Sequence, residues 1–173
     1  MLGIPAQSAR TFVVVQSVVN LSGRIYTLVQ GQTTSNLAWV GIDVNTFMTK
    51  GNLEGVYVTD HSFDSDLPTA TGARLHVLMV QDMEIGVEIL PRISYRVNSQ
   101  TRTLTRNPGG LGDGTFEDFS GADFTFVGYG GSASASAYVA EALIYDHVLS
   151  AQELEQVEQT LSSRYGIAQP DAP

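Results

Sequence analysis

The stretch that decides the fold is Tyr138 to Ile167, which reads YVAEALIYDHVLSAQELEQVEQTLSSRYGI. Its first eight residues alternate small, branched and aromatic side chains, a pattern that suits a strand packed on both faces. Its second half has the apolar spacing of an amphipathic helix. The stretch therefore predicts a long strand that leads directly into one short helix laid on a sheet.

The predicted helix runs from about Ala151 to Tyr165 and has matching signals at both ends. Ser150 and Glu153 have the spacing of a capping box, in which each side chain binds the backbone amide of the other residue. Gly166 follows the last turn and can adopt the left-handed conformation that ends many helices. One apolar stripe is expected to face the sheet, and its members are Leu154, Val157, Leu161 and Tyr165.

The rest of the chain alternates β-branched or aromatic runs with turns, and it predicts mostly strands. The expected strands are 11–19, 24–30, 37–44, a short one near Phe47, 55–59, 74–80, 84–90, 93–97 and 124–129. The stretch 84–90 is expected to form a hairpin with 74–80, and the polar stretch 61–71, which contains Pro68, is expected to be a loop. About ten short strands with one terminal helix favour a two-sheet sandwich.

Composition limits the domain count and the kinds of partner. The chain has 173 residues, a net charge of −9 and no cysteine. This length fits one domain, and the missing thiols exclude disulfides and thiolate metal sites. The acidic balance argues against nucleic acid and against anionic membranes as partners, and no apolar run is long enough to span a bilayer. We expect an N-terminal arm at 1–9, one domain at 10–167 and a flexible tail at 168–173.

Several of these segments resemble one known family. The C-terminal motifs are Ala140-Glu141, Tyr145-Asp146, Leu149-Ser150 and Ser163-Arg164-Tyr165-Gly166, and the upstream runs Thr11–Val15, His76–Val80 and Tyr95–Asn98 follow in the family's order. They resemble bacterial and phage members of the concanavalin A-like lectin/glucanase superfamily, the laminin-G-like jelly rolls. Ser99 stands where that family has a turn glycine. The resemblance implies an all-β, two-sheet antiparallel jelly-roll sandwich with one C-terminal helix, and it implies fold more firmly than function.

Catalysis has little support in the sequence. Retaining glycosidases need two carboxylates about 5 Å apart. The nearest pairs here are Asp82 with Glu84 and Glu84 with Glu88, which are expected at a turn and on the solvent face of a strand. The three histidines are scattered, with His76 expected inside a strand and His147 beside the helix cap. We therefore predict a protein that is not an enzyme.

Two acidic stretches could hold calcium, which prefers oxygen ligands. The first lies in the glycine-rich segment 107–123, and its candidate ligands are Asp113, Asp118 and Asp123. The second lies in and beside the expected loop 61–71 and consists of Asp60, Asp64 and Asp66. Acidic residues in loops also serve as turn formers, so Ca²⁺ and turn formation both remain open as interpretations.

The first function class is a structural protein that binds other proteins. The resemblance implies a phage virion component, such as a capsid decoration or tail-associated protein, that contacts other virion proteins or copies of itself. The family's strand before Thr11 is missing, which would leave an open sheet edge. Contacts with a neighbouring subunit in a homo-oligomer or virion are therefore expected at this edge and at Met1, Leu2, Ile4 and Arg10.

The alternative class is a glycan-binding module of a bacterial extracellular or cell-surface protein. Trp39, Tyr57, Tyr129 and Phe116 would then stack on sugar rings, while Asn98 and acidic loop residues would supply hydrogen bonds. For each aromatic residue the other interpretation is packing in the core, which is favoured for Trp39, the only tryptophan. From the sequence alone the structural class ranks first, because the chain carries no companion catalytic domain.

Overall fold

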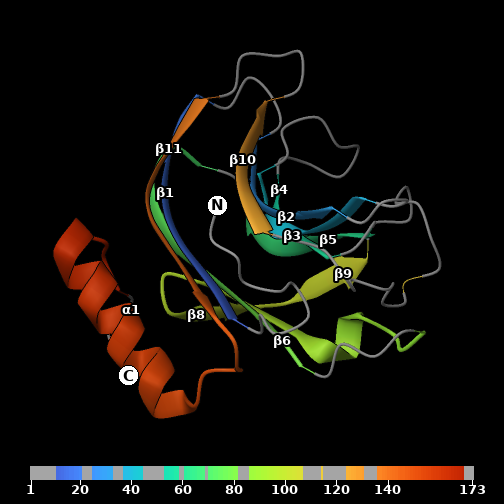
Figure 1. Cartoon of the computed structure of the whole chain (residues 1–173). Helices are drawn as coiled ribbons and strands as arrows, with labels where there is room; N and C mark the ends of the chain where they lie inside the picture. Colours follow the sequence, from blue (N-terminus) through green and yellow to red (C-terminus); the bar gives the residue numbers. More distant parts are fainter. Residues whose placement is uncertain are drawn as a thin grey trace.

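The structure of this chain is a computed structural model. It describes residues 11–20, 25–32, 37–44, 53–58, 61–68, 70–81, 86–106, 114, 124–130 and 136–169; for 20, 25–32, 37–44, 57, 62, 124–130 and 136 it describes the backbone and its pairing. The described residues form two facing sheets with a helix outside one of them (Figure 1).

In chain order the elements are β1 (Thr11–Asn20), β2 (Ile25–Gln32), β3 (Leu37–Val44), β4 (Leu53–Val58), β5 (His61–Pro68), β6 (Gly72–Val80), the 3-10 turn η2 (Leu90–Arg92), β7 (Ile93–Val97), β8 (Gln100–Arg102), β9 (Leu104–Arg106), β10 (Phe124–Gly130), β11 (Ser136–Tyr145) and α1 (Ala151–Tyr165). One sheet has the order β11-β1-β6-β7-β8 and the other β10-β2-β3-β4-β5-β9. Neighbouring strands run antiparallel. This arrangement is the all-β sandwich that the sequence predicts.

The prediction of a loop at 61–71 is wrong, because β5 occupies most of it. His61, Phe63 and Ser65 are buried on one face, while Asp64 and Asp66 alternate with them on the other. Period-two burial of this kind defines a strand, and β4 and β9 pair with it on its two sides. The sequence did not indicate this strand, because the polar residues that alternate with the buried ones made the stretch resemble a loop.

The expected hairpin between 74–80 and 84–90 is also wrong. β6 pairs with β7 instead, with Leu78 opposite Tyr95. The described residues 86–90 form turns and a single bridge, and Gly86 has φ +79. A glycine at positive φ followed closely by Pro91 interrupts a regular strand. Ile89 still reaches the core, where it is fully buried.

The strand that starts at Thr11 is not an edge strand. β1 pairs with β11 on one side and with β6 on the other. The expectation of an open edge beside it is therefore wrong, since β11 fills that place and is itself the outermost described strand of the sheet. Met1, Leu2, Ile4 and Arg10 lie outside the described residues, so the predicted subunit contacts remain a prediction.

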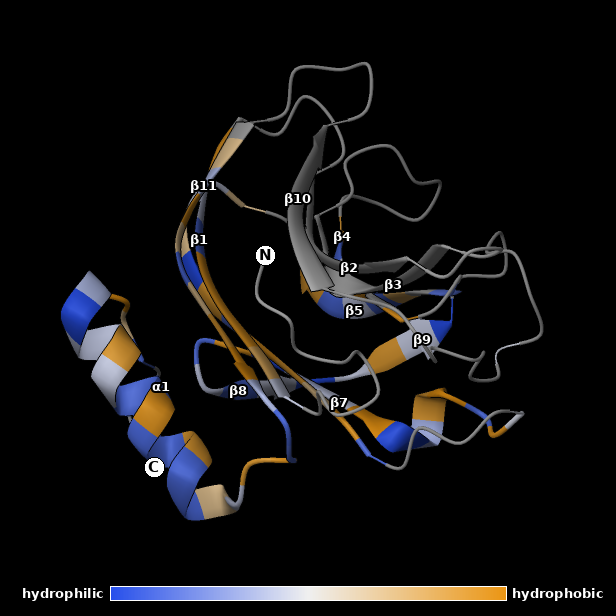
Figure 2. Cartoon of the chain, viewed as in Figure 1, coloured by the Kyte–Doolittle hydropathy of each residue, from blue (hydrophilic) through white to orange (hydrophobic). Residues whose placement is uncertain are grey.

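The helix α1 covers the side of the five-stranded sheet that points away from the other sheet. Leu154 and Leu161 of the helix belong to one core cluster with the sheet residues Val13, Val15, Leu75 and Val77. The opposite side of β1 faces the other sheet, where Phe12, Val14 and Val18 join the inter-sheet core. Figure 2 shows apolar colouring along β1 and apolar patches on α1. The run Phe12 to Val15 is continuous because both faces of this strand are covered.

The helix has the ends that the sequence predicts. The Ser150 amide donates to Glu153 Oε2 at 2.9 Å, and the Glu153 amide donates to Ser150 Oγ at 3.4 Å. Gly166 is left-handed, with φ 63. α1 is 15 residues long, and no described helix has the length and apolar character needed to cross a membrane.

A two-residue turn joins β7 to β8. Val97 pairs with Gln100, so Asn98 and Ser99 form the loop, and their φ angles are 49 and 65. Two successive positive φ values are the mark of a type I′ hairpin turn, in which asparagine followed by glycine is favoured. The serine at position 99 therefore occupies a conformation that glycine adopts more easily.

We expect Leu161→Ala to lower the free energy of unfolding by about 2–5 kcal/mol, because it leaves a cavity between α1 and the sheet. Leu161 is 2% exposed. Urea denaturation measures the change. Gln152→Ala, at an exposed position of the same helix, is the control and should change stability by less than about 0.5 kcal/mol. Equal stability of Leu161→Ala and the parent would contradict the packing described here.

We expect Ser99→Gly to stabilise the protein by about 0.5–1 kcal/mol, since it relieves the cost of a non-glycine residue in the left-handed region. It also removes the buried Ser99 hydroxyl, which has no hydrogen-bond partner. Asn98→Gly is the matched control. It should not stabilise, because it removes the 2.9 Å bond from the Leu75 amide to Asn98 Oδ1. A loss of stability in Ser99→Gly, measured by thermal unfolding, would argue against this turn type.

Candidate functional site

The two faces of the six-stranded sheet differ in character. Val56, Val58 and Phe63 are buried and belong to the core between the sheets. Because residues alternate along a strand, positions 55 and 57 of β4 and 62 and 64 of β5 belong to the opposite face. We call this second side the outer face. Since α1 occupies the outer side of the other sheet, the outer face is the sheet surface that α1 leaves uncovered.

Strand register arranges the outer face in rows. The first row crosses the whole sheet and contains Tyr129, Tyr26, Asp43, Gly55, Asp64 and Thr105. The second contains Val127, Leu28, Gly41, Tyr57 and Ser62. The third contains Thr125, Gln30 and Trp39. Four aromatic positions therefore share one face with hydroxyl, amide and carboxylate residues and two glycines.

Gly55 has a structural reason to be glycine. A Cβ at this position would collide with the backbone carbonyl oxygen of Phe63 on β5. The pairing of β4 with β5 is irregular between Leu53 and Gly55. The close approach of the two strands requires a residue without a side chain. The first row therefore has no side chain between positions 43 and 64, where the backbones of β4 and β5 lie close together.

The sequence singled out some of these aromatic positions. Tyr129 lies on β10 directly opposite Tyr26 of β2. Position 39 pairs with Gln30 and alternates with Val40, in line with position 57; the side chain of Trp39 lies outside the described residues, so its packing in the core stays a prediction. Tyr26 carried no signal in the sequence. Only the pairing of distant strands brings these positions together.

The other predicted ligand-binding residues do not join this face. Asn98 lies in the turn of the other sheet, where its Oδ1 accepts from the Leu75 amide at 2.9 Å and its own amide donates to the Leu75 carbonyl at 2.8 Å. It therefore holds a turn in place. Phe116 lies outside the described residues, and its role as a stacking residue remains a prediction.

The predicted calcium ligands are largely outside the described residues as well, namely Asp113, Asp118 and Asp123. Of the second acidic set, Asp64 and Asp66 lie on the strand β5 and not in a loop. Within the part of the chain that the structure describes, no three His, Asp or Glu residues come close enough to hold a metal ion. Calcium binding at the 107–123 segment remains a prediction.

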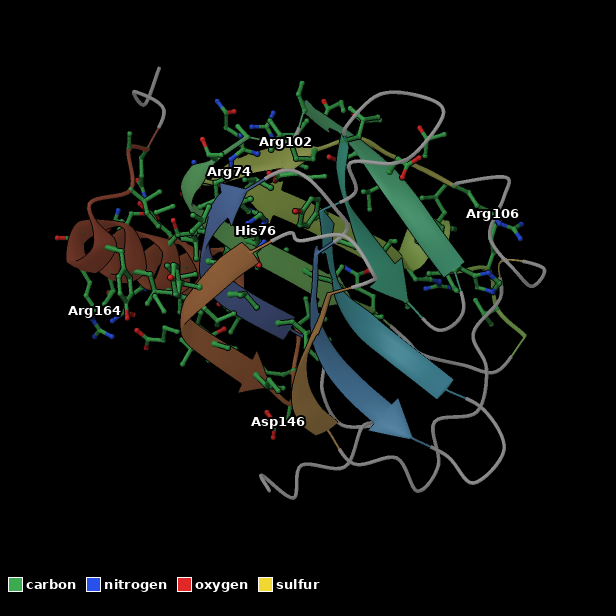
Figure 3. All side chains as sticks on the ribbon, turned by 90° about the horizontal axis from the view of Figure 1, so that it is seen from above. Arg74, His76, Arg102, Arg106, Asp146 and Arg164 are labelled. Atoms are coloured by element: carbon green, nitrogen blue, oxygen red, sulfur yellow. The ribbon has the colours of Figure 1, made fainter. Side chains whose placement is uncertain are left out.

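A cluster of polar side chains is buried between the two sheets. Glu54 of β4 is fully buried, and its Oε1 accepts a hydrogen bond from Arg74 of β6. His76, two residues further along β6, has its Nδ1 2.8 Å from the Tyr95 hydroxyl and its Nε2 3.2 Å from Gln16 Nε2. Figure 3 shows Arg74 and His76 close together, with Arg102 beside them.

Burial shifts the two titratable groups of this cluster in opposite directions. Burial raises the pKa of Glu54 from 4.5 to about 7, against the lowering effect of Arg74. Burial, assisted by the charge of Arg74, lowers the pKa of His76 from 6.5 to about 3. His76 is therefore neutral at physiological pH. Because the Gln16 amide donates to Nε2, the ring proton lies on Nδ1, which donates to Tyr95.

This cluster connects the two sheets, and its two titratable groups are buried. Glu54 has a raised pKa like many general acids, but both it and His76 are sealed from solvent. A retaining glycosidase needs a second carboxylate about 5 Å away, and no described carboxylate accompanies Glu54 in the cluster. Its interactions join β4 of one sheet to β6 of the other.

A groove of about 200 Å³ lies between α1 and β11. Arg164 donates to Glu141 Oε2 at 2.6 Å on its border, and the Tyr165 hydroxyl donates to the same oxygen at 2.8 Å. The groove is smaller than the roughly 300–1,000 Å³ of ordinary ligand pockets. Its one carboxylate, Glu141, is already bonded to Arg164 and Tyr165. We therefore assign the outer face, and not this groove, as the candidate site.

No family model and no curated protein matches this sequence. Two solved structures resemble the fold. The CBM40 module of the Ruminococcus gnavus IT-sialidase has a TM-score of 0.54 and 16% identity, over 89% of this chain and 84% of that module. A leech intramolecular trans-sialidase in complex with 2,7-anhydro-Neu5Ac has a TM-score of 0.57 and 12% identity, over 98% of this chain and 25% of that enzyme.

A tetrameric galectin from the ball sponge Cinachyrella sp. gives a TM-score of 0.48 and 11% identity, over 80% of this chain and 92% of the galectin. At these identities the similarities of the sialidase proteins show the fold alone. That fold is the jelly-roll sandwich expected from the sequence. The narrower resemblance to phage members remains a prediction.

The two buried groups should give opposing pH dependences. The stability that Glu54 contributes is fully present below pH 4.5 and is lost as the pH rises through about 7. The stability that His76 contributes is present above pH 6.5 and is lost as the pH falls through about 3. Between pH 4.5 and 6.5 the two slopes oppose each other, so the free energy of unfolding should be nearly flat there.

Glu54→Gln removes the fall in the free energy of unfolding that Glu54 causes above pH 4.5. The stability of this variant should therefore keep rising up to pH 6.5. The difference in the free energy of unfolding between Glu54→Gln and the parent should change by up to about 3 kcal/mol between pH 4.5 and 6.5, at about 1.4 kcal/mol per pKa unit. Urea denaturation between about pH 3 and about pH 8 measures both profiles. The exposed carboxylates contribute equally to the pH dependence of both proteins, so their contribution cancels in the difference. Parallel profiles would show that Glu54 does not titrate in this range.

Proposed function

We propose that this protein binds glycans, without catalysis, through the outer face of its six-stranded sheet. The observation that carries the proposal is the set of aromatic positions Tyr26, Trp39, Tyr57 and Tyr129, which strand register collects on one face. Aromatic rings offer large flat apolar surfaces on which the C–H side of a sugar ring can pack.

The surroundings of these aromatics suit a sugar ligand. Thr105 and Asp64 stand in the same row as Tyr26 and Tyr129, and they supply hydrogen-bonding groups beside the aromatic surface. A hydrogen-bonded sheet holds such residues in a fixed arrangement, which lowers the entropy cost of binding.

The fold is in keeping with this proposal. One structural neighbour is a CBM40 module and another is a trans-sialidase in complex with 2,7-anhydro-Neu5Ac. The polar cluster around Glu54 offers no exposed acid and base, which supports a binding role and not a hydrolytic one. A glycan binder of this kind would act outside the cell or at a bacterial cell surface.

Truncating an aromatic residue of the outer face should weaken glycan binding by about 10-fold, or roughly 1.4 kcal/mol. The test variants are Tyr57→Ala and Tyr129→Ala. Tyr138→Ala is the matched control, because Tyr138 is a highly exposed tyrosine (72%) on the other sheet. A glycan array followed by isothermal titration with the best ligand measures the change. Equal losses in all three variants, or no binding to any glycan, would refute the proposal.

A second candidate function, protein assembly, is favoured by one exposed apolar patch. Val19, Tyr138 and Val139 are 52%, 72% and 44% exposed. Tyr138 and Val139 pair with residues 17 and 16 of β1, so all three lie at the same end of the β1–β11 pair. Clustered exposed apolar residues commonly mark protein contacts. Such contacts would serve a homo-oligomer or a place in a virion.

If this patch mediates assembly, the parent protein should form oligomers or bind a particle, and Val139→Lys should abolish the interaction by placing a charge in the contact. Light scattering across a concentration series measures the molar mass. Glu155→Lys, a charge change on the exposed side of α1, is the control. A parent protein that stays monomeric and binds no particle would leave the patch without this role.

A further inference from the structure

We propose that two copies of this chain form a symmetric dimer in which Tyr138 of each copy enters the groove between α1 and β11 of the other copy. This inference rests on the second candidate function, assembly through the exposed patch at Val19, Tyr138 and Val139, and it specifies the partner and the contact. It does not involve the six-stranded sheet.

Tyr138 lies on the same side of the five-stranded sheet as the groove. It is 72% exposed and pairs with Ser17, which alternates with Gln16 of the polar cluster between the sheets. Glu141, on the border of the groove, pairs with Val15, which packs beneath α1. The register shifts between these two pairs, so residues three apart on β11 share the side that carries α1. The exposed tyrosine and the groove are therefore two parts of one surface.

The groove has the size and the walls that suit one aromatic ring. Its volume is about 200 Å³, and its apolar walls are Leu143 of β11 and Val157 and Leu161 of α1. An apolar cavity of about 150 Å³ binds benzene. Leu143 and Val157 are only partly buried, so a ring placed between them would remove further apolar surface from water. The groove is thus too small for an ordinary ligand and large enough for one side chain.

The border of the groove offers a partner for the tyrosine hydroxyl. Arg164 and Tyr165 both donate to Glu141 Oε2, so within the described residues the other oxygen, Oε1, remains as an acceptor. The hydrogen bonds from Tyr165 and Arg164 lower the pKa of Glu141, which keeps this carboxylate ionised. A phenol combines one apolar ring with one hydrogen-bond donor, and this combination matches the groove.

Twofold symmetry allows both contacts to form at once. An axis that crosses β11 beside Ala140 and Glu141 makes the two strands antiparallel and has positions 138 and 143 equally far on either side. Tyr138 of each copy then lies beside Leu143 of the other, and the interface uses the same patch twice. Glu141 and Arg164 lie near this axis as an ion pair, so they add no net charge to a contact between two chains of net charge −9.

Sedimentation velocity of the full chain across a concentration series measures the dissociation constant of the dimer. Tyr138→Ala should raise it by about 100-fold, or about 10-fold for each of the two contacts. Tyr138→Phe loses only the hydroxyl and should raise it by about 10-fold. Thr160→Trp fills the groove from its exposed border and should act like Tyr138→Ala. Gln152→Trp, at an exposed position of α1 away from the groove lining, is its control.

A mixture of Tyr138→Ala and Thr160→Trp tests the exchange of side chains directly. The first variant keeps an open groove and the second keeps the tyrosine, so a mixed dimer retains one of the two contacts. Each variant alone retains neither. The mixed dimer should therefore be about 10-fold tighter than the dimer of either variant. Contact through the patch without the groove does not produce this complementation.

The outcomes separate the groove contact from assembly in general. Tyr138 and Thr160 are both exposed, and thermal unfolding verifies that their variants are folded. A dimeric parent together with equal association of Thr160→Trp and Gln152→Trp overturns the groove contact and leaves assembly through the patch intact. A mixture that associates no more tightly than its components also overturns it. If the parent chain is a monomer throughout the series, the second candidate function and this inference are both wrong.

Discussion

The structure depends on one strand that is buried from both sides. β1 has neighbours along both edges, and its residues alternate between two separate cores. Phe12 and Val14 pack between the sheets, while Val13 and Val15 pack beneath α1. This strand therefore cannot tolerate a polar face, and the helix is needed to complete it. Removing α1 would expose a row of valines on β1 and apolar residues on β6 at the same time.

This constraint divides the molecule into a covered side and a side that α1 leaves uncovered. In the five-stranded sheet, the face that points away from the other sheet is covered by α1. Ion pairs of Arg96 with Glu158 and of Arg164 with Glu141 hold the helix against it. The six-stranded sheet has an apolar inner face and a mixed outer face. The glycan site proposed above lies on the outer face of that sheet.

The core between the sheets is not uniformly apolar. Glu54, Arg74 and His76 lie within it, and the Arg74 guanidinium also donates to the Pro68 carbonyl at 3.2 Å. Burying such groups costs free energy, which the hydrogen bonds offset only in part, because Glu54 Oε2 has no hydrogen-bond partner. What the cluster provides is a directional link between β4 and β6, which apolar contacts alone do not give.

Local signals allowed the sequence by itself to determine the helix, its capping box and the all-β character of the chain. Ser150, Glu153 and Gly166 act within a few residues of one another, so their roles can be deduced without the fold. The tertiary structure alone decided that β5 is a strand, that β1 is internal and that Asn98 holds a turn. It also decided which aromatic residues share a face. Each of these depends on pairing between residues far apart in the chain, and strand register is set by the whole sheet, not by any local pattern.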